Sequence, residues 1–227
     1  MGIWPTRSYA WWESQRALPP ISILSRSAVR RAAPLTKYCA HVMEEVGGFE
    51  PDTPIVFGSC LGSISVLFSL LEQMAEDGVE GLSPIRFSGS VHHAPASTVG
   101  VSNAHKGFLN AISANEDLSA MALLEAIMTA NEHGETMVVI AEEAWPPAFG
   151  PVFEPFAAAL VLTPGQDRNL SLQMSSQPYQ SPLPDLLDGN PAAPIQHLMD
   201  WFETAKVGEY HVLCPALNGK SWVAICE

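Results

Sequence analysis

The sequence predicts an α/β domain in which amphipathic helices cover a β-sheet in layers. Short apolar runs typical of buried strands alternate along the chain with segments whose apolar residues recur at helical spacing. The chain has 227 residues, of which 47% are hydrophobic and 15% are charged. This composition supplies enough apolar side chains for the core of a domain, and it excludes a disordered or fibrous chain.

Residues 1–33 contain tryptophans and prolines without clear periodicity, and we interpret them as an irregular arm that packs on the core. The arm is basic, because residues 1–37 hold six of the 11 Lys and Arg residues and one of the 24 acids, a net charge of +5. The remaining 190 residues carry −18. We expect Arg30 and Arg31 to meet this acidic surface and the tryptophans to cover apolar area.

The first strand-turn-helix unit follows the arm. A helix is predicted over 34–46, because Pro34 suits the first helical position and the glycine pair at 47–48 ends the pattern. The apolar run at 54–58 predicts a short strand. The next predicted helix spans 62–76 and carries its apolar side chains on one face.

A second unit of the same kind follows a stretch of glycine, serine and other small residues. It consists of a predicted strand at 108–113 and a predicted helix at 117–131. Two further apolar runs, at 136–141 and 157–163, predict buried strands. Strands that alternate with amphipathic helices in this way indicate the layered α/β class.

The C-terminal part is predicted to complete the same domain. The segment 170–174 is expected to pair with 157–163 as an antiparallel hairpin and to end the α/β core, which spans 34–174. Residues 175–227 follow, beginning with a proline-rich stretch at 175–194 that we interpret as an extended surface loop. The last predicted elements are a helix and two short strands, at 195–206, 210–214 and 222–226.

Charge, hydropathy and cysteine spacing exclude several classes of function. The net charge of −13 repels nucleic acid and anionic membranes. The longest uncharged apolar run, 61–71, is shorter than the ~20 residues of a membrane span. No signal peptide is expected, so the cytoplasm is the default location. The four cysteines lack paired spacing, and we predict no disulfide, metal or cofactor.

The turn at 58–62 admits a catalytic interpretation. Its sequence, Gly-Ser-Cys-Leu-Gly between a strand and a helix, has the form of a nucleophile elbow with Cys60 exposed at its centre. This alternative predicts a cysteine-dependent thioesterase or esterase. Its acid and base would be found among five residues further along the chain, none of which is marked by the residues around it: Asp185, Asp188, Asp200, His197 and His211. We favour the simpler interpretation, a tight turn in which Ser59 caps the helix and Cys60 is merely small.

Two polar clusters favour structural roles. His92 and His93 are adjacent in a segment interpreted as extended, so they point to opposite faces and cannot chelate one ion together. A site that combines one of them with His105 is the less favoured alternative. The cluster at 115–117, Asn-Glu-Asp, lies between a strand and a helix, where such residues meet the free N–H groups of the first helical turn.

The middle of the chain resembles the N-terminal half of a β-ketoacyl synthase, a condensing enzyme of the thiolase fold. The strand and turn at 56–62 are similar to the strand of that family that ends in Ser-x-x-Gly. The segment 83–94 matches its Pro-x-x-Phe-x-x-Ser-Val-x-Asn pattern, with His93 in place of the Asn. The arginine pair at 30–31 resembles the pair before the first long helix of the family. The resemblance covers residues 25–165 and implies a thiolase-like half-fold with layered α/β/α arrangement and a truncated second half.

The resemblance also implies that this chain is not a condensing enzyme by itself. Active members carry a nucleophilic cysteine at the elbow that opens the second helix, where this chain has Glu116. An alignment shifted by one residue places Asn115 or Asp117 there, and neither is a thiol. The two catalytic histidines belong to the second half, which is largely missing. No catalytic residue is therefore assigned, and a decarboxylase assisted by Glu116 is disfavoured because its enolate would lack stabilisation.

Inactive relatives of this kind are chain length factors, which pair with an active ketosynthase. The resemblance implies a heterodimer whose interface and tunnel residues include Glu116, His93 and the strand before the elbow: Leu109, Asn110, Ala111, Ile112 and Ser113. The partner would carry out the condensation and receive the acyl carrier protein, while this chain shapes the acyl tunnel. The short members resemble proteins of aryl polyene biosynthesis, and the route is polyketide-like or fatty-acid-like.

Overall fold

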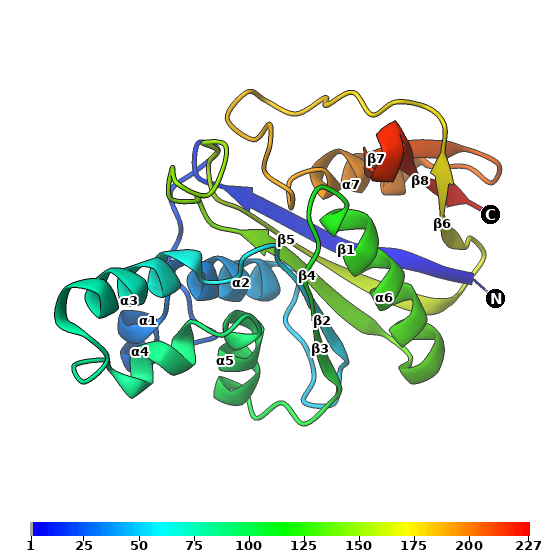
Figure 1. Ribbon diagram of the computed structural model, residues 1–227. Coiled ribbons are helices and arrows are strands. Elements are labelled where there is room, and N and C mark those ends of the chain that lie inside the picture. Colours follow the sequence, from blue (N-terminus) through cyan, green and yellow to red (C-terminus); the bar gives the residue numbers. More distant parts are fainter. Residues whose placement is uncertain (1) are drawn as a thin grey trace.

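A five-stranded mixed sheet forms the centre of the computed structural model, which describes residues 2–227 (Figure 1). The strand order is β1-β5-β4-β2-β3, so β1 and β3 form the two edges. The strands are β1 Gly2–Trp12, β2 Ile55–Gly58, β3 Leu109–Ile112, β4 Thr136–Glu142 and β5 Phe156–Gln166. β2 pairs in parallel with β3 and β4, whereas β5 is antiparallel to both β4 and β1.

Helices cover both faces of this sheet, which confirms the layered α/β/α prediction. The helices before the elbow are α1 Arg26–Arg31, α2 Pro34–Glu45, α3 Ile64–Asp77, α4 Pro84–Gly89 and α5 Ala94–Ser102. The helix after the elbow is α6 Leu118–His133, and α7 Ile195–Thr204 follows near the C-terminus. In Figure 1, α2 and α5 lie on one side of the sheet and α6 lies on the other.

Each face of the sheet contributes to its own buried core. Alternate residues of a strand point to opposite faces, so Phe57 and Val139 pack in one core while Val56 and Val138 pack in the other. Because β2, β4 and most of β5 are buried on both faces, their sequences are continuous apolar runs rather than alternating ones. This is why these strands were recognisable in the sequence.

Residues 2–12 form a strand, and the prediction of an irregular arm over 1–33 was wrong in this part; Met1 lies outside the described residues. β1 pairs antiparallel with β5 along its whole length and buries Ile3, Trp4 and Trp11. Pro5 obscured the pattern, but it lies on an edge strand beside a register shift, where a missing backbone N–H is tolerated. Arg30 and Arg31 form no ion pair among residues 2–227.

The predicted hairpin between 157–163 and 170–174 was also wrong. β6 Leu170–Ser175 instead pairs with β8 Ser221–Cys226, and β8 pairs with β7 Tyr210–Pro215 in a separate three-stranded antiparallel sheet. Both edges of β5 are already occupied by β1 and β4, so β6 has no edge of β5 to join. The elements after 194 agree with their predictions. The stretch 175–194 forms no regular helix or strand after Ser175, but the prediction of a surface loop was wrong for its end, where Leu187, Ala192 and Ala193 are buried in the core.

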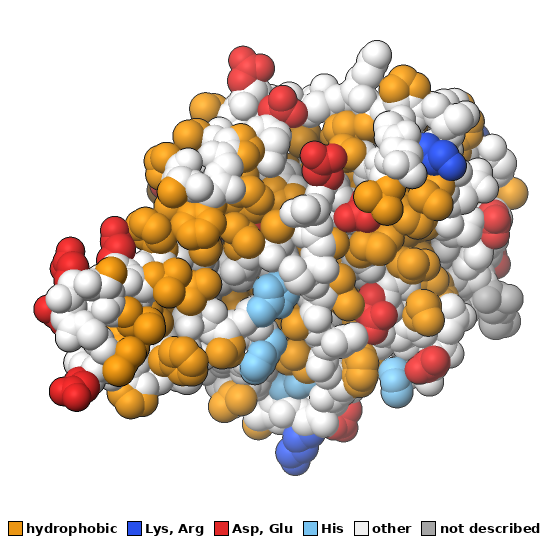
Figure 2. All heavy atoms as spheres, in the orientation of Figure 1, with side chains coloured by type: hydrophobic (Ala, Val, Ile, Leu, Met, Phe, Trp, Pro, Cys, Tyr) orange, Lys and Arg blue, Asp and Glu red, His pale blue; other side chains and the backbone are white. Residues whose placement is uncertain are grey.

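Two short helices, α4 and α5, occupy a stretch for which no helix was predicted. Each has a proline in its first turn, at positions 84 and 95. The small residues of α5 gave no amphipathic pattern, because this helix is apolar on most sides and packs on α2. The lobe of α3 and α4 exposes apolar side chains (Figure 2): Leu71, Met74, Ile85 and Phe87.

Within residues 2–227, no helix is both long enough and apolar enough to cross a membrane.

Candidate functional site

The elbow between β3 and α6 presents Glu116 to solvent. The edge strand β3 ends at Ile112, a short turn follows, and α6 begins at Leu118 with Asp117 as its N-cap residue. Glu116 precedes the cap, and its carboxylate forms no hydrogen bond among the described residues, so it does not cap the helix. The elbow therefore holds a free, exposed carboxylate at the end of a sheet strand.

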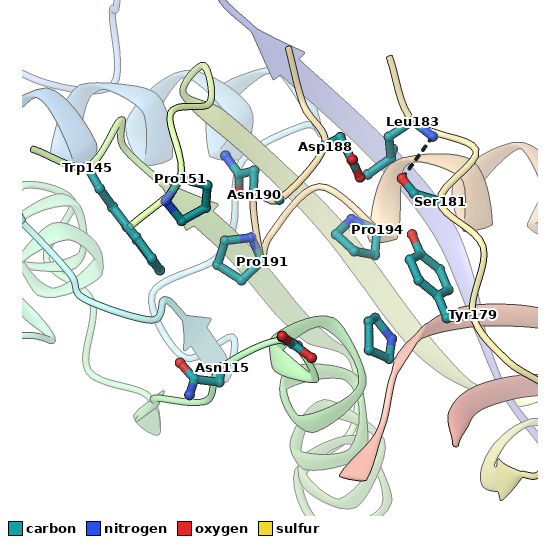
Figure 3. Close-up of a pocket in the computed structure, with 13 residues that line it drawn as sticks. Asn115, Trp145, Pro151, Tyr179, Ser181, Leu183, Asp188, Asn190, Pro191 and Pro194 are labelled. Atoms are coloured by element: carbon teal, nitrogen blue, oxygen red, sulfur yellow. Dashed lines mark hydrogen bonds between the residues drawn. The ribbon is translucent and has the colours of Figure 1, made fainter. Parts of the chain in front are cut away.

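A cavity of about 440 Å³ opens beside the elbow (Figure 3). Three parts of the chain form its walls: the elbow, the connection between β4 and β5, and the proline-rich loop with the end of β7. The lining residues are Asn115, Glu116, Trp145, Pro151, Tyr179, Ser181, Leu183, Asp188, Gly189, Asn190, Pro191, Pro194 and Pro215. No cysteine or histidine is among them, so the cavity lacks the nucleophile and base that acyl transfer from a thioester requires.

The turn after β2 is held by Glu142, a buried residue at the end of β4. Glu142 accepts hydrogen bonds from the Ser59 hydroxyl at 2.9 Å, the Cys60 N–H at 2.6 Å and the Leu61 N–H at 3.3 Å. Ser59 also accepts from the Gly62 N–H at 2.9 Å, so it closes the turn and does not cap α3, whose N-cap is Ser63. The predicted tight turn is confirmed, but the predicted cap was wrong.

The carboxylate of Glu142 is fully enclosed. Burial raises its pKa to about 7, although the donors around it favour the ionised form. The fourth donor is the indole N–H of Trp145, at 2.8 Å, and Trp145 lines the cavity. Glu142 therefore joins the turn after β2 to one wall of the cavity at the elbow.

Cys60 is not placed to act as a nucleophile. Its side chain is 8% exposed, and its thiol donates to the Asn115 side-chain oxygen at 3.4 Å rather than to an imidazole. Burial, with a smaller effect of the Glu142 charge, raises the pKa of the Cys60 thiol to about 11. The geometry gives no support to the hydrolase interpretation.

The two histidines considered as catalytic partners of Cys60 contact each other instead. His197 on α7 and His211 on β7 share a hydrogen bond of 2.8 Å between Nδ1 and Nε2, respectively. Burial and the neighbouring His211 lower the pKa of His197 to about 4. Of the acids considered, Asp188 lines the cavity. Asp185 and Asp200 form no side-chain hydrogen bond within residues 2–227, so the structure assembles no triad.

The remaining histidines serve the local fold. His92 and His93 lie in a turn and at the N-cap of α5, so the extended segment expected there was wrong. The Nε2 atom of His92 donates to the Ser59 carbonyl at 2.7 Å, and that of His105 donates to the Thr53 carbonyl at 2.8 Å. In the part of the chain that the structure describes, no three His, Cys, Asp or Glu side chains cluster as metal ligands.

The sequence reasoning missed the acid pair at 142–143. Glu143 is buried beside Glu142 and accepts from the Ser65 N–H at 2.7 Å and the Ser65 hydroxyl at 3.1 Å, in the first turn of α3. Burial raises the pKa of Glu143. Two adjacent acids at the end of a wholly apolar strand were the available signal, because such groups are buried only when they have partners.

Comparison with known proteins shows which family and which solved structures this chain is similar to. A family model described as β-ketoacyl synthase, N-terminal domain, matches residues 3–213. No curated protein matches the sequence. A chain from the complex of a ketosynthase with its chain length factor from Xenorhabdus doucetiae has a TM-score of 0.75 and 18% identity, with 99% of each chain covered.

Longer solved structures share part of the architecture. The ishigamide ketosynthase/chain length factor has a TM-score of 0.58 and 14% identity over 69% of this chain and 53% of that one. A β-ketoacyl synthase from Burkholderia phymatum has a TM-score of 0.52 and 17% identity over 69% and 52%. This chain thus spans about half the length of both. The likeness shows a shared fold, and the prediction of a thiolase-like half-fold is confirmed.

Proposed function

This chain belongs to the β-ketoacyl synthase N-terminal domain family, and we propose that it is a non-catalytic subunit that pairs with an active ketosynthase. Its role is that of a chain length factor, which shapes the acyl tunnel of its partner and so limits the length of the product. The acyl chain itself is carried by the acyl carrier protein and the partner.

The observation that carries this proposal is the carboxylate of Glu116 at the elbow. The elbow is where the family resemblance places a nucleophilic cysteine, and a carboxylate cannot form the thioester that condensation needs. The cavity beside Glu116 has neither a thiol nor an imidazole in its walls. Of the thiols near the elbow, Cys60 is buried and bonded to Asn115. Cys214 is also buried, close to Asp117, and burial raises its pKa to about 12.

The free edge of the central sheet favours a protein partner. β3 pairs with β2 on one side, and no strand among residues 2–227 pairs with its other side. The residues proposed for the interface, Leu109 to Ser113, lie on and directly after this strand, and those on β3 are only partly buried. A strand of a ketosynthase that pairs there would cover the open edge.

Apolar side chains extend this surface. Phe108 precedes β3 and stacks on His133 at the end of α6, and it is 41% exposed. On α6, Met128 is 55% exposed. Exposed apolar groups beside an open strand edge are typical of an interface. We assign His93, which is exposed at the start of α5, to the same interface.

The descriptions of similar solved structures support a ketosynthase as the partner. Two of the solved structures with this fold are described as a ketosynthase with its chain length factor. We therefore propose a ketosynthase of polyketide or aryl polyene biosynthesis as the second subunit, with the acyl carrier protein recruited through it.

Coexpression with a candidate ketosynthase from the same organism tests the proposal. We expect the two proteins to purify together in equal amounts, and the double variant F108E/M128E to separate them. The control is V207E, which adds a charge at an apolar residue that is 67% exposed after α7. The proposal is wrong if the wild-type chain stays separate and the ketosynthase works equally well without it.

A further inference from the structure

The charged side chains that line the cavity at the elbow are all negative. Of its 13 lining residues, two are acids, Glu116 and Asp188, and none is Lys, Arg or His. Among residues 2–227, neither of these carboxylates forms a side-chain hydrogen bond or an ion pair. Their negative charges are therefore not compensated within the chain, and a ligand that carries a phosphate or a carboxylate would be repelled.

Aromatic rings form part of the apolar wall. Trp145 is held in place by its N–H bond to Glu142 at 2.8 Å and by an edge contact with Phe153, with ring centroids 5.1 Å apart. Tyr179 lies in the wall that the proline-rich loop provides (Figure 3). Burial raises the pKa of Tyr179 to about 12, so its phenol stays neutral. The faces of such rings attract cations, most strongly where water is partly excluded.

The cavity is also rigid and of suitable size. Four prolines line it, at 151, 191, 194 and 215, and each fixes one backbone angle before any ligand binds. Asn190 anchors the loop, because its side chain donates to the Glu154 carbonyl at 3.0 Å and accepts from the Ala192 N–H at 2.9 Å. A volume of about 440 Å³ lies in the range of small-molecule sites. A preformed site loses little entropy when it binds a ligand.

We propose that this cavity binds a small organic cation with an apolar body, such as an aryl or alkyl ammonium ion. Glu116 supplies the counter-charge at the elbow, with Asp188 on the opposite wall. The prolines and the ring of Trp145 contact the apolar body. This binding is a property of the single chain and does not depend on its pairing with a ketosynthase.

Calorimetric titration of the full chain tests this site with three aromatic probes of similar size and different charge. Phenyltrimethylammonium is the cation, benzyl alcohol the neutral probe and benzoate the anion. We expect the cation to bind about tenfold more tightly than either of the others. The E116Q variant should weaken the cation about fivefold and leave the neutral probe unchanged.

The control variant is E132Q, which removes the same charge from an exposed residue in the last turn of α6. We expect it to change the affinity for the cation less than about twofold, because Glu132 does not line the cavity. An equal loss with E132Q would show only general attraction to a chain of net charge −13 and would overturn the proposal. Equal affinity for the three probes, or no binding of the cation up to about 10 mM, would also overturn it.

Discussion

The Glu142 carboxylate accepts the backbone N–H of Cys60 at 2.6 Å, and this contact removes from the most enzyme-like motif of the sequence a free N–H that an active site would need. In a nucleophile elbow, free N–H groups near the nucleophile bind the oxyanion of the reaction. Here the N–H groups of Cys60 and Leu61 already bind a carboxylate from the neighbouring strand. These N–H groups are therefore not available to a substrate.

The raised pKa of Glu142 predicts a distinctive pH dependence of stability. Its pKa is about 7 in the folded chain, against an ordinary value of 4.5, so between these values the folded state binds more protons than the unfolded state. The free energy of unfolding should fall as the pH rises from about 4.5 to about 7, by up to about 3 kcal/mol from this group. Urea unfolding of wild type and E142Q across this range measures the effect.

The difference between the two unfolding curves isolates Glu142 from other titrating groups. It should slope between pH 4.5 and 7 and be level above pH 7. Replacement of exposed Glu132 by Gln is the matched control, and the E142Q curve is compared with it. If the E142Q difference does not change between pH 4.5 and 7, the account of a buried carboxylate with a raised pKa is contradicted.

The thiol of Cys60 should be unreactive in the native protein. With a pKa of about 11, about one molecule in a thousand carries the thiolate at pH 8. Intact mass after treatment with iodoacetamide should show little modification of Cys60 in the native chain and complete modification after unfolding. Rapid labelling of Cys60 in the folded chain, or hydrolysis of small thioesters that C60A abolishes, would restore the hydrolase interpretation.

The histidine pair predicts the opposite pH dependence for the C-terminal sheet. Because the pKa of His197 is lowered to about 4, the folded state binds fewer protons than the unfolded state, which titrates near 6.5. The stabilisation is fully present above pH 6.5 and is lost as the pH falls towards 4. Unfolding of wild type and H197Q at pH 7.5 and pH 5 should show the wild-type advantage decreasing in acid.

Exposed His133 provides the comparison, since it lies at the end of α6 and has 45% of its side chain exposed. H133Q is measured at the same two pH values, so that the effect of losing the His197 contact is separated from the loss of any one imidazole. If H197Q keeps the same acid sensitivity as the wild type, the contact between His197 and His211 is not its source.

Gly58 should tolerate no larger side chain. A Cβ atom at this position would lie 2.8 Å from the Cβ of Ala122, where α6 packs directly on β2. We expect G58A to lower the free energy of unfolding by about 1 to 3 kcal/mol. The control G48A has nothing within 4 Å of the added atom, although its positive φ of 70° imposes a smaller backbone cost. A G58A variant as stable as wild type would show that α6 does not approach β2 this closely.

Local patterns predicted most of the elements, because the relevant information lies in short stretches of sequence. The apolar runs of β2, β4 and β5 and the faces of α2, α3 and α6 follow from burial on one or two sides. These local patterns did not predict which strands pair when the strands are distant in the chain. The partner of β6 is β8 rather than β5, and this depends on β1 having taken the free edge of β5.

The candidate site was predicted only in part, because it also depends on contacts between segments that are distant in the chain. Resemblance to a family indicated the elbow and Glu116, and the exposed carboxylate lies in that turn. Glu142 and Trp145 were not recognised from the sequence. Glu142 acts through its contact with Cys60, which is 82 positions away in the chain. Trp145 acts as part of a cavity wall that distant segments form together. Only the unusual pair of acids after a buried strand marked this region.

The central claim, a ketosynthase subunit without its own nucleophile, is tested most directly by intact mass. The purified complex with its ketosynthase is incubated with an acyl carrier protein loaded with an acyl chain, and the mass of each subunit is measured. We predict that the acyl mass is added to the ketosynthase and that this chain keeps its unmodified mass. An acyl group on this chain, retained in E116Q and lost in C60A, would contradict the claim.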